Sequence, residues 1–301
     1  MINGVLNILK PTGMTSHDVV SSVRKILNMK KVGHAGTLDP NVSGVMVVCV
    51  GKGTKISEYL MNQDKEYVCE LILGQKTDTQ DSYGVIVEET EKKEPENISE
   101  QVLLNALEEF KGRQQQIPPA YSAVKLNGKK LYEYARQNIS VEKEAKEIYI
   151  RDIQLIKYEN NRALMRVKCS KGTYMRTLCN DIGEKLGTLG HMGVLVRTET
   201  KGLHIENSVT LNELKFLYDN NRLNECLIPI DKVYPLKKVS VHTDYYDRLT
   251  AGNEIYAKAD EIEDEEFYIY CNDQLIGIGK KINNSTVKIE KMLIDTGGIN
   301  E

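Results

Sequence analysis

Apolar positions along the chain recur with the two periods that distinguish helices from strands. Val19, Val20 and Val23 are spaced as on one face of a helix, whereas residues 65–73 alternate, with Tyr67 and Cys69 on the same side. The same reading predicts further strands at residues 3–9, 45–50, 147–157, 163–170 and 193–199, and helices at 99–110, 131–136, 171–186 and 211–217. Because helices and hairpin-like strand pairs are mixed along the chain, we predict an α+β fold with a mixed, largely antiparallel sheet flanked by helices.

The pattern changes near residues 229–235. Beyond this point Phe267, Ile269 and Cys271 alternate as in a short strand, and Gly277-Ile278-Gly279 predicts a hairpin turn. This last part of the chain carries eight basic and thirteen acidic residues, so it is more acidic than the rest. We therefore predict a large domain of residues 1–235 and a small β-rich domain of residues 236–301.

Residues 112–130 follow neither period. They contain Arg113, three glutamines and the pair Pro118-Pro119. Two prolines exclude a helix interior or a central strand. A polar loop of this length inside a domain is typically functional or disordered.

Composition narrows the class of protein. With 41% apolar and 28% charged residues, the 301-residue chain has the composition of an ordinary globular protein. The longest apolar run, residues 45–50, is too short to cross a bilayer, and residues 1–10 lack the apolar core of a secretory signal. Six cysteines without a CxxC pair and five scattered histidines favour reduced thiols and no metal site. We expect a cytoplasmic protein that binds neither a membrane nor a metal.

The net charge of −3 is unevenly distributed. Residues 10–55 carry seven basic against two acidic side chains, and residues 111–136 carry six against one. Residues 88–109 carry eight acidic against two basic side chains. Separated basic blocks are typical of a protein that meets a polyanion on one face, although a solvated charged surface remains the simpler alternative.

The candidate chemistry begins with Asp39. It lies in a glycine-rich stretch, residues 32–44, between a predicted helix and a predicted buried strand. Glycines let the backbone approach a ligand closely, and a carboxylate on such a loop is suited to catalysis. The alternative is that Asp39-Pro40 only starts a turn.

Two further side chains are candidates for the same site. Tyr67 lies in the middle of a predicted strand, where its ring either faces a cleft or caps the core. Arg176 lies at a predicted helix start, where a cation is disfavoured by the helix dipole and so implies a carboxylate or phosphate partner. Its alternative is a surface pair with Asp181 or Glu184.

Five motifs occur in an order that resembles one known family. They are Lys10-Pro11-x-Gly13-x-Thr15-Ser16, Gly33-His34-x-Gly36-x-Leu38-Asp39-Pro40-x-x-x-Gly44, Lys65-x-Tyr67, Pro118-Pro119-x-x-Ser122-Ala123-x-Lys125 and Gly172-Thr173-Tyr174-x-Arg176. Together they resemble the TruB family, the bacterial tRNA pseudouridine-55 synthases, from Val5 to about Pro235. The tail resembles, more loosely, the small PUA domain that commonly follows.

This resemblance implies a pseudouridine synthase fold and the isomerisation of uridine 55 in the T-loop of tRNA, after the base is flipped out, with no cofactor. Asp39 would be the nucleophile, attacking either the uracil ring or the ribose. Arg176 would pair with Asp39 and keep it ionised, and Tyr67 would stack on the target base.

The resemblance also assigns residues to RNA binding. His34 would fill the space left by the flipped base, Leu195 would line the pocket, and Tyr174 would also belong to the substrate-binding residues. Residues of about 112–136 would form a mobile thumb over the T-arm. The side chains expected to neutralise phosphates are Lys10, Lys55, Lys125, Lys129 and Lys130. The protein would act as a monomer without an obligatory protein partner.

Three other functions compete with this interpretation. A non-catalytic RNA-binding or RNA-chaperone protein on the same scaffold would not need Asp39. A guide-RNA-dependent synthase shares the core motifs but requires partner proteins. A metal-dependent phosphoesterase would need clustered ligands, which the scattered histidines and cysteines do not supply.

Overall fold

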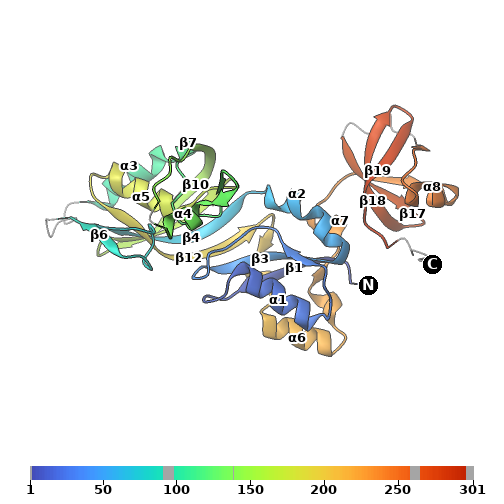
Figure 1. Ribbon diagram of the computed structural model, residues 1–301, viewed down its shortest axis with the longest axis horizontal. Helices are drawn as coiled ribbons and strands as arrows, with labels where there is room; N and C mark the ends of the chain where they lie inside the picture. Colours follow the sequence, from blue (N-terminus) through green and yellow to red (C-terminus); the bar gives the residue numbers. More distant parts are fainter. Residues whose placement is uncertain (1, 91–97, 138, 258–264, 296–301) are drawn as a thin grey trace.

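The computed structural model describes residues 2–90, 98–137, 139–257 and 265–295. Two sheets dominate it, a long one and a small C-terminal one that lies apart beyond α2 (Ser57–Met61) and α7 (Ile230–Val233) (Figure 1). The acidic block predicted at residues 88–109 lies in part, at 91–97, outside the described residues.

The long sheet carries the elements that later form the site. Among the described residues it has ten strands: β14 (Leu227–Ile228), β1 (Gly4–Lys10), β3 (Ser43–Val50), β12 (Gly190–Thr200), β4 (Lys65–Leu73), β11 (Arg162–Cys169), β10 (Lys146–Glu159) and β7 (Gly112–Gln116) in this order, with β13 (Leu203–His204) on β12 and β2 (Val32–His34) on β3. Its pairs are antiparallel except β12 with β3, which are parallel at Val196 and Ser43. The predicted mixed, largely antiparallel sheet is therefore confirmed.

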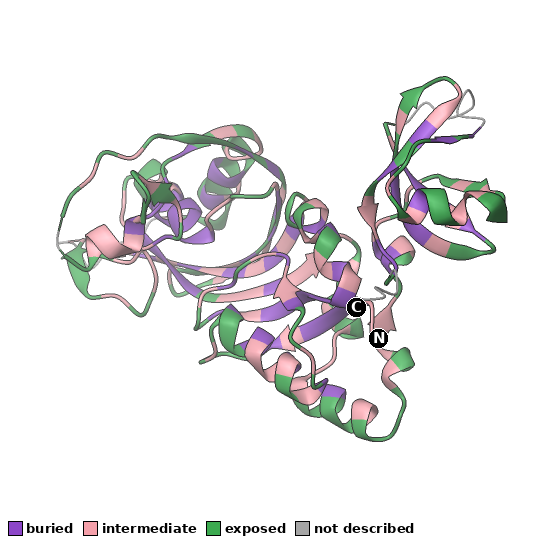
Figure 2. Ribbon diagram, turned by 45° about the vertical axis from the view of Figure 1, so that its right-hand side comes forward, coloured by how far each residue is buried: buried purple, intermediate pink, exposed green. Residues whose placement is uncertain are grey.

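Helices cover this sheet in two groups (Figure 1). α1 (Ser16–Ile26) and α6 (Leu211–Asp219) lie together near β1 and β3, and α3 (Glu100–Glu109) and α5 (Met175–Lys185) lie at the other end. α1 and α6 each begin with a capping box, in which Thr15 or Thr210 bonds the backbone three residues on and an acid returns the bond. Figure 2 shows the buried residues concentrated in the strands and on the inner sides of the helices.

The C-terminal sheet has the strand order β15 (Lys238–Val241), β17 (Glu266–Cys271), β18 (Gln274–Asn283), β19 (Thr286–Met292) and β16 (Ile255–Tyr256). Its own core surrounds the fully buried Phe267. This β-rich unit is the PUA-like part expected from the sequence.

The short elements complete the description. They are the 3-10 turns η1 (Gly51–Ile56), η2 (Ile205–Asn207), η3 (Leu223–Glu225) and η4 (Thr243–Tyr245), the helices α4 (Leu131–Ala135) and α8 (Tyr246–Thr250), and the hairpins β5 (Gln75–Thr77) with β6 (Ile86–Glu89) and β8 (Lys125–Leu126) with β9 (Lys129–Lys130). No helix in the described part of the chain is both long enough and apolar enough to span a bilayer.

Two local predictions were wrong. The first five residues of the predicted loop 112–130 form β7, because pairing with β10 at the sheet edge overrides their polar composition. Gly277 and Gly279 lie inside β18, whereas the hairpin turn is made by Asn272 and Asp273 at positive φ. The two glycines are required by packing, because a Cβ on Gly279 would overlap the side chain of Ile269.

Candidate active site

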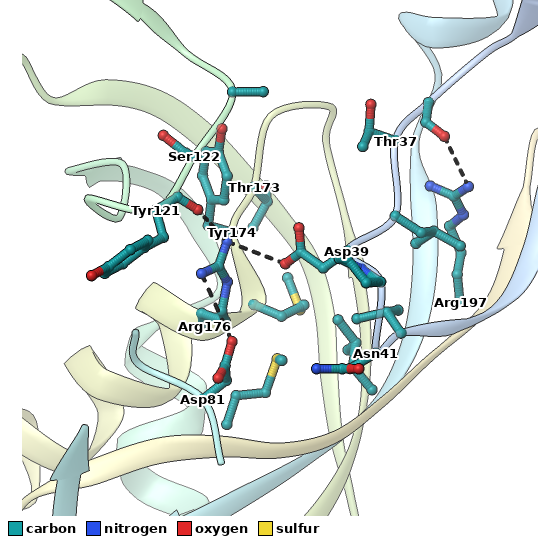
Figure 3. A pocket seen from close by; sticks show the side chains of 18 of the residues that line it. Thr37, Asp39, Asn41, Asp81, Tyr121, Ser122, Thr173, Tyr174, Arg176 and Arg197 are labelled. Carbon is teal, nitrogen blue, oxygen red and sulfur yellow. Dashed lines mark hydrogen bonds and ion pairs between the residues drawn. The ribbon is translucent and has the colours of Figure 1, made fainter. Parts of the chain in front are cut away.

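A single pocket of about 700 Å³ brings together side chains from five distant parts of the chain. Tyr67 comes from β4 and Leu195 from β12. Asp39 comes from the loop between β2 and β3, Arg176 from α5 and Tyr121 from the loop between β7 and β8 (Figure 3). The topology makes this convergence possible, because β3, β12 and β4 are neighbours in the sheet.

Asp39 and Arg176 form an ion pair at the centre of the pocket. Asp39 Oδ2 lies 3.1 Å from Arg176 Nη2, and the exposed fractions of the two side chains are 47% and 7%. The guanidinium also donates to the carbonyls of Thr79 at 3.2 Å and of Tyr121 at 2.8 Å. The structure thus places Arg176 against Asp39, as predicted, and not in a surface pair. A half-exposed carboxylate held by a buried guanidinium is oriented yet accessible to a substrate.

Asp81 is a second acid on the same guanidinium, and sequence reasoning missed it. Its Oδ2 lies 3.8 Å from Arg176 Nη1 (Figure 3), while Oδ1 accepts hydrogen bonds from the Thr79 hydroxyl at 2.7 Å and the Tyr83 amide at 3.0 Å. An aspartate among polar residues is normally assigned to a turn. Asp81 does form that turn, and its contact with Arg176, far away in the sequence, leaves no local signal.

Lys10 anchors the loop that carries Asp39. Its ammonium group is fully buried and donates to the carbonyls of Pro11, Pro40 and Val42 at 2.9, 3.0 and 2.7 Å. Burial lowers the pKa of Lys10. The predicted contact of Lys10 with RNA phosphates is therefore corrected, because all three ammonium hydrogens are engaged inside the protein.

Arg197 braces the other side of the loop and was not singled out from the sequence. Only 1% of this residue is exposed, and its guanidinium donates to the carbonyls of Val45 at 2.7 Å and Gly36 at 3.3 Å. Its backbone passes so close to Gly44 that a Cβ there would overlap the Arg197 carbonyl oxygen. The one available signal was a cation directly after the apolar run of residues 194–196. A cation that is buried needs polar partners.

Tyr67 and Leu195 line the pocket from neighbouring strands. Cys69, two residues after Tyr67, is paired with Leu195, and Tyr67 itself is paired with Arg197. Burial raises the pKa of the Tyr67 hydroxyl, although the Arg197 guanidinium opposes that shift. The phenol is therefore neutral at neutral pH and presents a ring to the pocket.

Tyr174 and Lys65 complete the polar lining. Burial raises the pKa of Tyr174, and the charge of the Arg176 guanidinium opposes this. Burial lowers the pKa of Lys65 to about 8, although its ammonium donates to the carbonyls of Met61 and Gln63. Both side chains belong to the pocket wall together with Asp39.

The other predicted RNA-binding residues lie outside this lining. His34 lies on β2, and its Nδ1 atom has no hydrogen-bond partner among the described residues. Its pKa is lowered, mainly by burial and next by the positive charge of Arg197. Lys55 is exposed, and its pKa is lowered by partial burial and by Lys52 and Lys31. Lys125 on β8 and Lys129 on β9 are exposed, and Lys130 Nζ lies 5.5 Å from the centre of the Tyr132 ring.

The described residues contain no group of three or more His, Cys, Asp or Glu side chains that could hold a metal ion. The two pocket acids, Asp39 and Asp81, face a shared guanidinium. The single positive charge of Arg176 balances one of these two negative charges.

Comparison with known proteins identifies the family of the chain. Residues 24–175 match the model of the TruB family pseudouridylate synthase N-terminal domain, and residues 176–234 match that of the tRNA pseudouridylate synthase B C-terminal domain. The chain is 41% identical to tRNA pseudouridine synthase B of Clostridioides difficile, over 97% of this chain and 100% of that protein. It is 43% identical to that of Alkaliphilus oremlandii, over 98% and 99%.

The fold is shared with a solved Cbf5–Nop10–Gar1 complex, where the TM-score is 0.73 at 28% identity and the alignment covers 97% of this chain and 85% of the other. Family models over most of the chain, relatives above 40% identity and this shared fold all point to the same family. The chain therefore belongs to the TruB family of pseudouridylate synthases.

Proposed function

We propose that this protein isomerises uridine 55 in the T-loop of tRNA to pseudouridine, with Asp39 as the nucleophile. The observation that carries the proposal is the ion pair of Asp39 with the buried Arg176, in a pocket that Tyr67 also lines. Its close relatives are named tRNA pseudouridine synthase B, which supports tRNA as the substrate.

The reaction balances without an oxidant or an energy source. The bond between N1 of uracil and C1′ of ribose breaks, the base turns, and C5 bonds to C1′; C5 loses a proton and N1 gains one. Asp39 forms a temporary covalent bond with the uracil ring or with C1′. Arg176 aims the carboxylate, because the ion pair at 3.1 Å holds Asp39 against a buried guanidinium.

The target base must leave its stack before Asp39 reaches it. Extrusion costs a few kcal/mol, which contacts elsewhere must offset. Tyr67 supplies a ring for stacking the extruded uracil, and Leu195 and Tyr174 enclose it. His34 then occupies the vacated space in the loop.

The thumb of residues 112–136 binds the T-arm in this proposal. Lys125, Lys129 and Lys130, with Lys55 on the main body, neutralise phosphates. The hydrogen bond of the Tyr121 carbonyl with Arg176 ties the thumb to the site. Residues 1–235 form the catalytic domain and residues 236–301 a PUA-like RNA-binding domain. The protein acts alone, as a cytoplasmic monomer.

The test is to incubate the purified protein with an unmodified tRNA transcript and map pseudouridine. Wild-type protein is expected to modify one position, in the T-loop, without added guide RNA or protein. Asp39→Asn is expected to abolish the modification, whereas Asp219→Asn, an exposed acid on α6, is the matched control and retains it. Retained tRNA binding by Asp39→Asn shows that it is folded. An active Asp39→Asn variant, or modification at many positions, contradicts the proposal.

A further inference from the structure

Tyr83 is an exposed aromatic side chain at the mouth of the catalytic pocket. It lines the pocket together with Asp39 and Arg176, yet 65% of the residue is exposed. Its hydroxyl has no hydrogen-bond partner among the residues that the structure describes. It lies in the turn between β5 and β6, which no motif of the sequence had singled out.

The turn that carries Tyr83 is held firmly. The Ser82 amide donates to the Met192 carbonyl at 2.9 Å, and the Met192 amide donates to the Gln80 carbonyl at 3.0 Å, so the turn is bonded to β12. The Tyr83 amide donates to Asp81 Oδ1 at 3.0 Å. At Gly84 a Cβ would overlap the side chains of Asp78 and Thr79, so the turn is closed as tightly as glycine permits.

This arrangement links Tyr83 to the reacting groups through one side chain. Asp81 bonds the Tyr83 amide with one oxygen and faces Arg176 at 3.8 Å with the other. The position of the Tyr83 backbone relative to Arg176 is therefore set by the fold. A ring on a rigid support loses little conformational entropy when a ligand stacks on it.

The surroundings indicate the class of ligand. Arg136 and Lys171 are exposed cations that line the same pocket. A single exposed tyrosine is ordinary on a protein surface. An exposed ring beside exposed cations, at a pocket that takes a nucleoside, is the combination that binds single-stranded nucleic acid by stacking and phosphate contacts.

We propose that Tyr83 stacks on a nucleobase of the RNA that flanks the extruded uridine. Tyr67, only 8% exposed, serves the target base, so Tyr83 at the mouth contacts a different nucleotide. Tyr83 takes no part in bond making and acts on binding of the substrate. The inference rests on the proposed function, since it names a further contact of the same site.

The test compares Tyr83→Ala, Tyr83→Phe and Tyr83→Leu with Phe216→Ala, which removes an aromatic side chain of similar exposure (57%) from α6. Dissociation constants for a T-arm stem-loop are measured in the Asp39→Asn background, so that no turnover occurs. Loss of one stacked base weakens binding on the order of 5- to 100-fold. We expect this loss for the Ala and Leu variants, and wild-type affinity for the Phe variant and the Phe216→Ala control.

A second readout separates stacking from a structural role. 2-Aminopurine is placed at each position flanking the target uridine in turn. At one position its fluorescence should be quenched by the protein that retains Tyr83 and by the Tyr83→Phe variant, and not by Tyr83→Ala. In the active enzyme Tyr83→Ala should raise KM by a similar factor and change kcat less than about threefold.

Failure of the stacking proposal can be distinguished from failure of the proposed function. If wild-type protein makes no pseudouridine in tRNA, the proposed function fails. If wild-type protein is active, any of three results overturns the stacking proposal. The first is that Tyr83→Ala binds and reacts like wild type, and the second is that Tyr83→Leu binds like wild type. The third is that no position shows quenching that depends on residue 83.

Discussion

At the scale of single residues, Arg176 is compensated from two sides. Asp39 and Asp81 both face its guanidinium, and two backbone carbonyls accept its remaining hydrogen bonds. A buried charge left without a partner costs several kcal/mol. In Asp39→Asn the Arg176 guanidinium still faces the charge of Asp81. We therefore expect this variant to fold but to lose its catalytic activity.

Lys65 makes stability depend on pH. Its pKa in the folded protein, about 8, lies below the value of about 10.4 for a free lysine. The unfolded chain therefore holds more protons between these two pKa values, and the free energy of unfolding gains a contribution that rises with pH across this window. The rise is at most on the order of 3 kcal/mol. Lys65→Met should remove it, as measured by urea unfolding at pH 7.5 and pH 10.

The control for this comparison is Lys125→Met, an exposed lysine in the thumb. It should show the same pH dependence as wild type, because other groups titrate equally in both proteins. Equal slopes for wild type and Lys65→Met would show that Lys65 keeps an ordinary pKa.

At the scale of elements, the loop between β2 and β3 is shaped by contacts from three strands. Lys10 at the end of β1 binds its carbonyls from below, Arg197 on β12 binds it from the side, and Gly44 at the start of β3 lets the backbone of β12 come close. Ser16 adds hydrogen bonds in both directions with the backbone of Leu38. Asp39 is therefore held by the sheet and not by the loop alone.

Gly44→Ala should disrupt this loop. The residue has φ +114°, and a Cβ would overlap the backbone of Arg197. Gly202→Ala is the matched control, because Gly202 has φ +71° with nothing within 4 Å of the added atom. The control should lose about 1–2 kcal/mol of stability from backbone strain alone. Gly44→Ala should lose more than about 3 kcal/mol and most of its activity, as measured by thermal unfolding and pseudouridine formation. Equal losses of stability in both variants would mean that the backbone of β12 moves away from residue 44 without a further loss of stability.

At the scale of the whole molecule, a continuous contact joins the two sheets. Leu60 and Val233 belong to the same apolar cluster as Tyr268 and Leu293 of the C-terminal part. The Tyr59 hydroxyl donates to Glu266 at 2.6 Å. The Tyr59 ring stacks on Tyr234 with 4.9 Å between centroids, and Lys291 Nζ lies 3.9 Å from its centre. The C-terminal sheet is therefore held at a defined angle to the site.

Tyr59→Ala should loosen this contact, since it removes the stacked ring, the cation–π contact and the hydrogen bond together. We expect a loss of about 2–4 kcal/mol and a larger radius of gyration in small-angle X-ray scattering. Tyr59→Phe, which removes only the hydrogen bond to Glu266, should lose about 1 kcal/mol and keep the wild-type scattering. Unchanged scattering for Tyr59→Ala would show that the apolar cluster alone orients the sheet.

The structure bears out those predictions that depend on neighbours in the chain. The alternation of residues 65–73 gave β4 with Tyr67 on its buried side, and the spacing of Val19, Val20 and Val23 gave α1 with these side chains buried. The ordered motifs led to the family and to the fold that the comparisons show. Predictions that ignored pairing failed, as at residues 112–116, where an edge of the sheet turned a polar stretch into a strand.

The sequence by itself determined the longer helices, most of the strands, the family and the candidates Asp39, Tyr67 and Arg176, because hydrophobic period and motifs can be identified without knowing which segments meet in space. Only the tertiary structure decided that Lys10 is buried beneath the loop, that Arg197 braces it and that Asp81 shares Arg176. The physical reason is that the role of a charged side chain depends on its burial and its partners. Both are set by segments that lie far apart in the chain and meet only when the sheet forms.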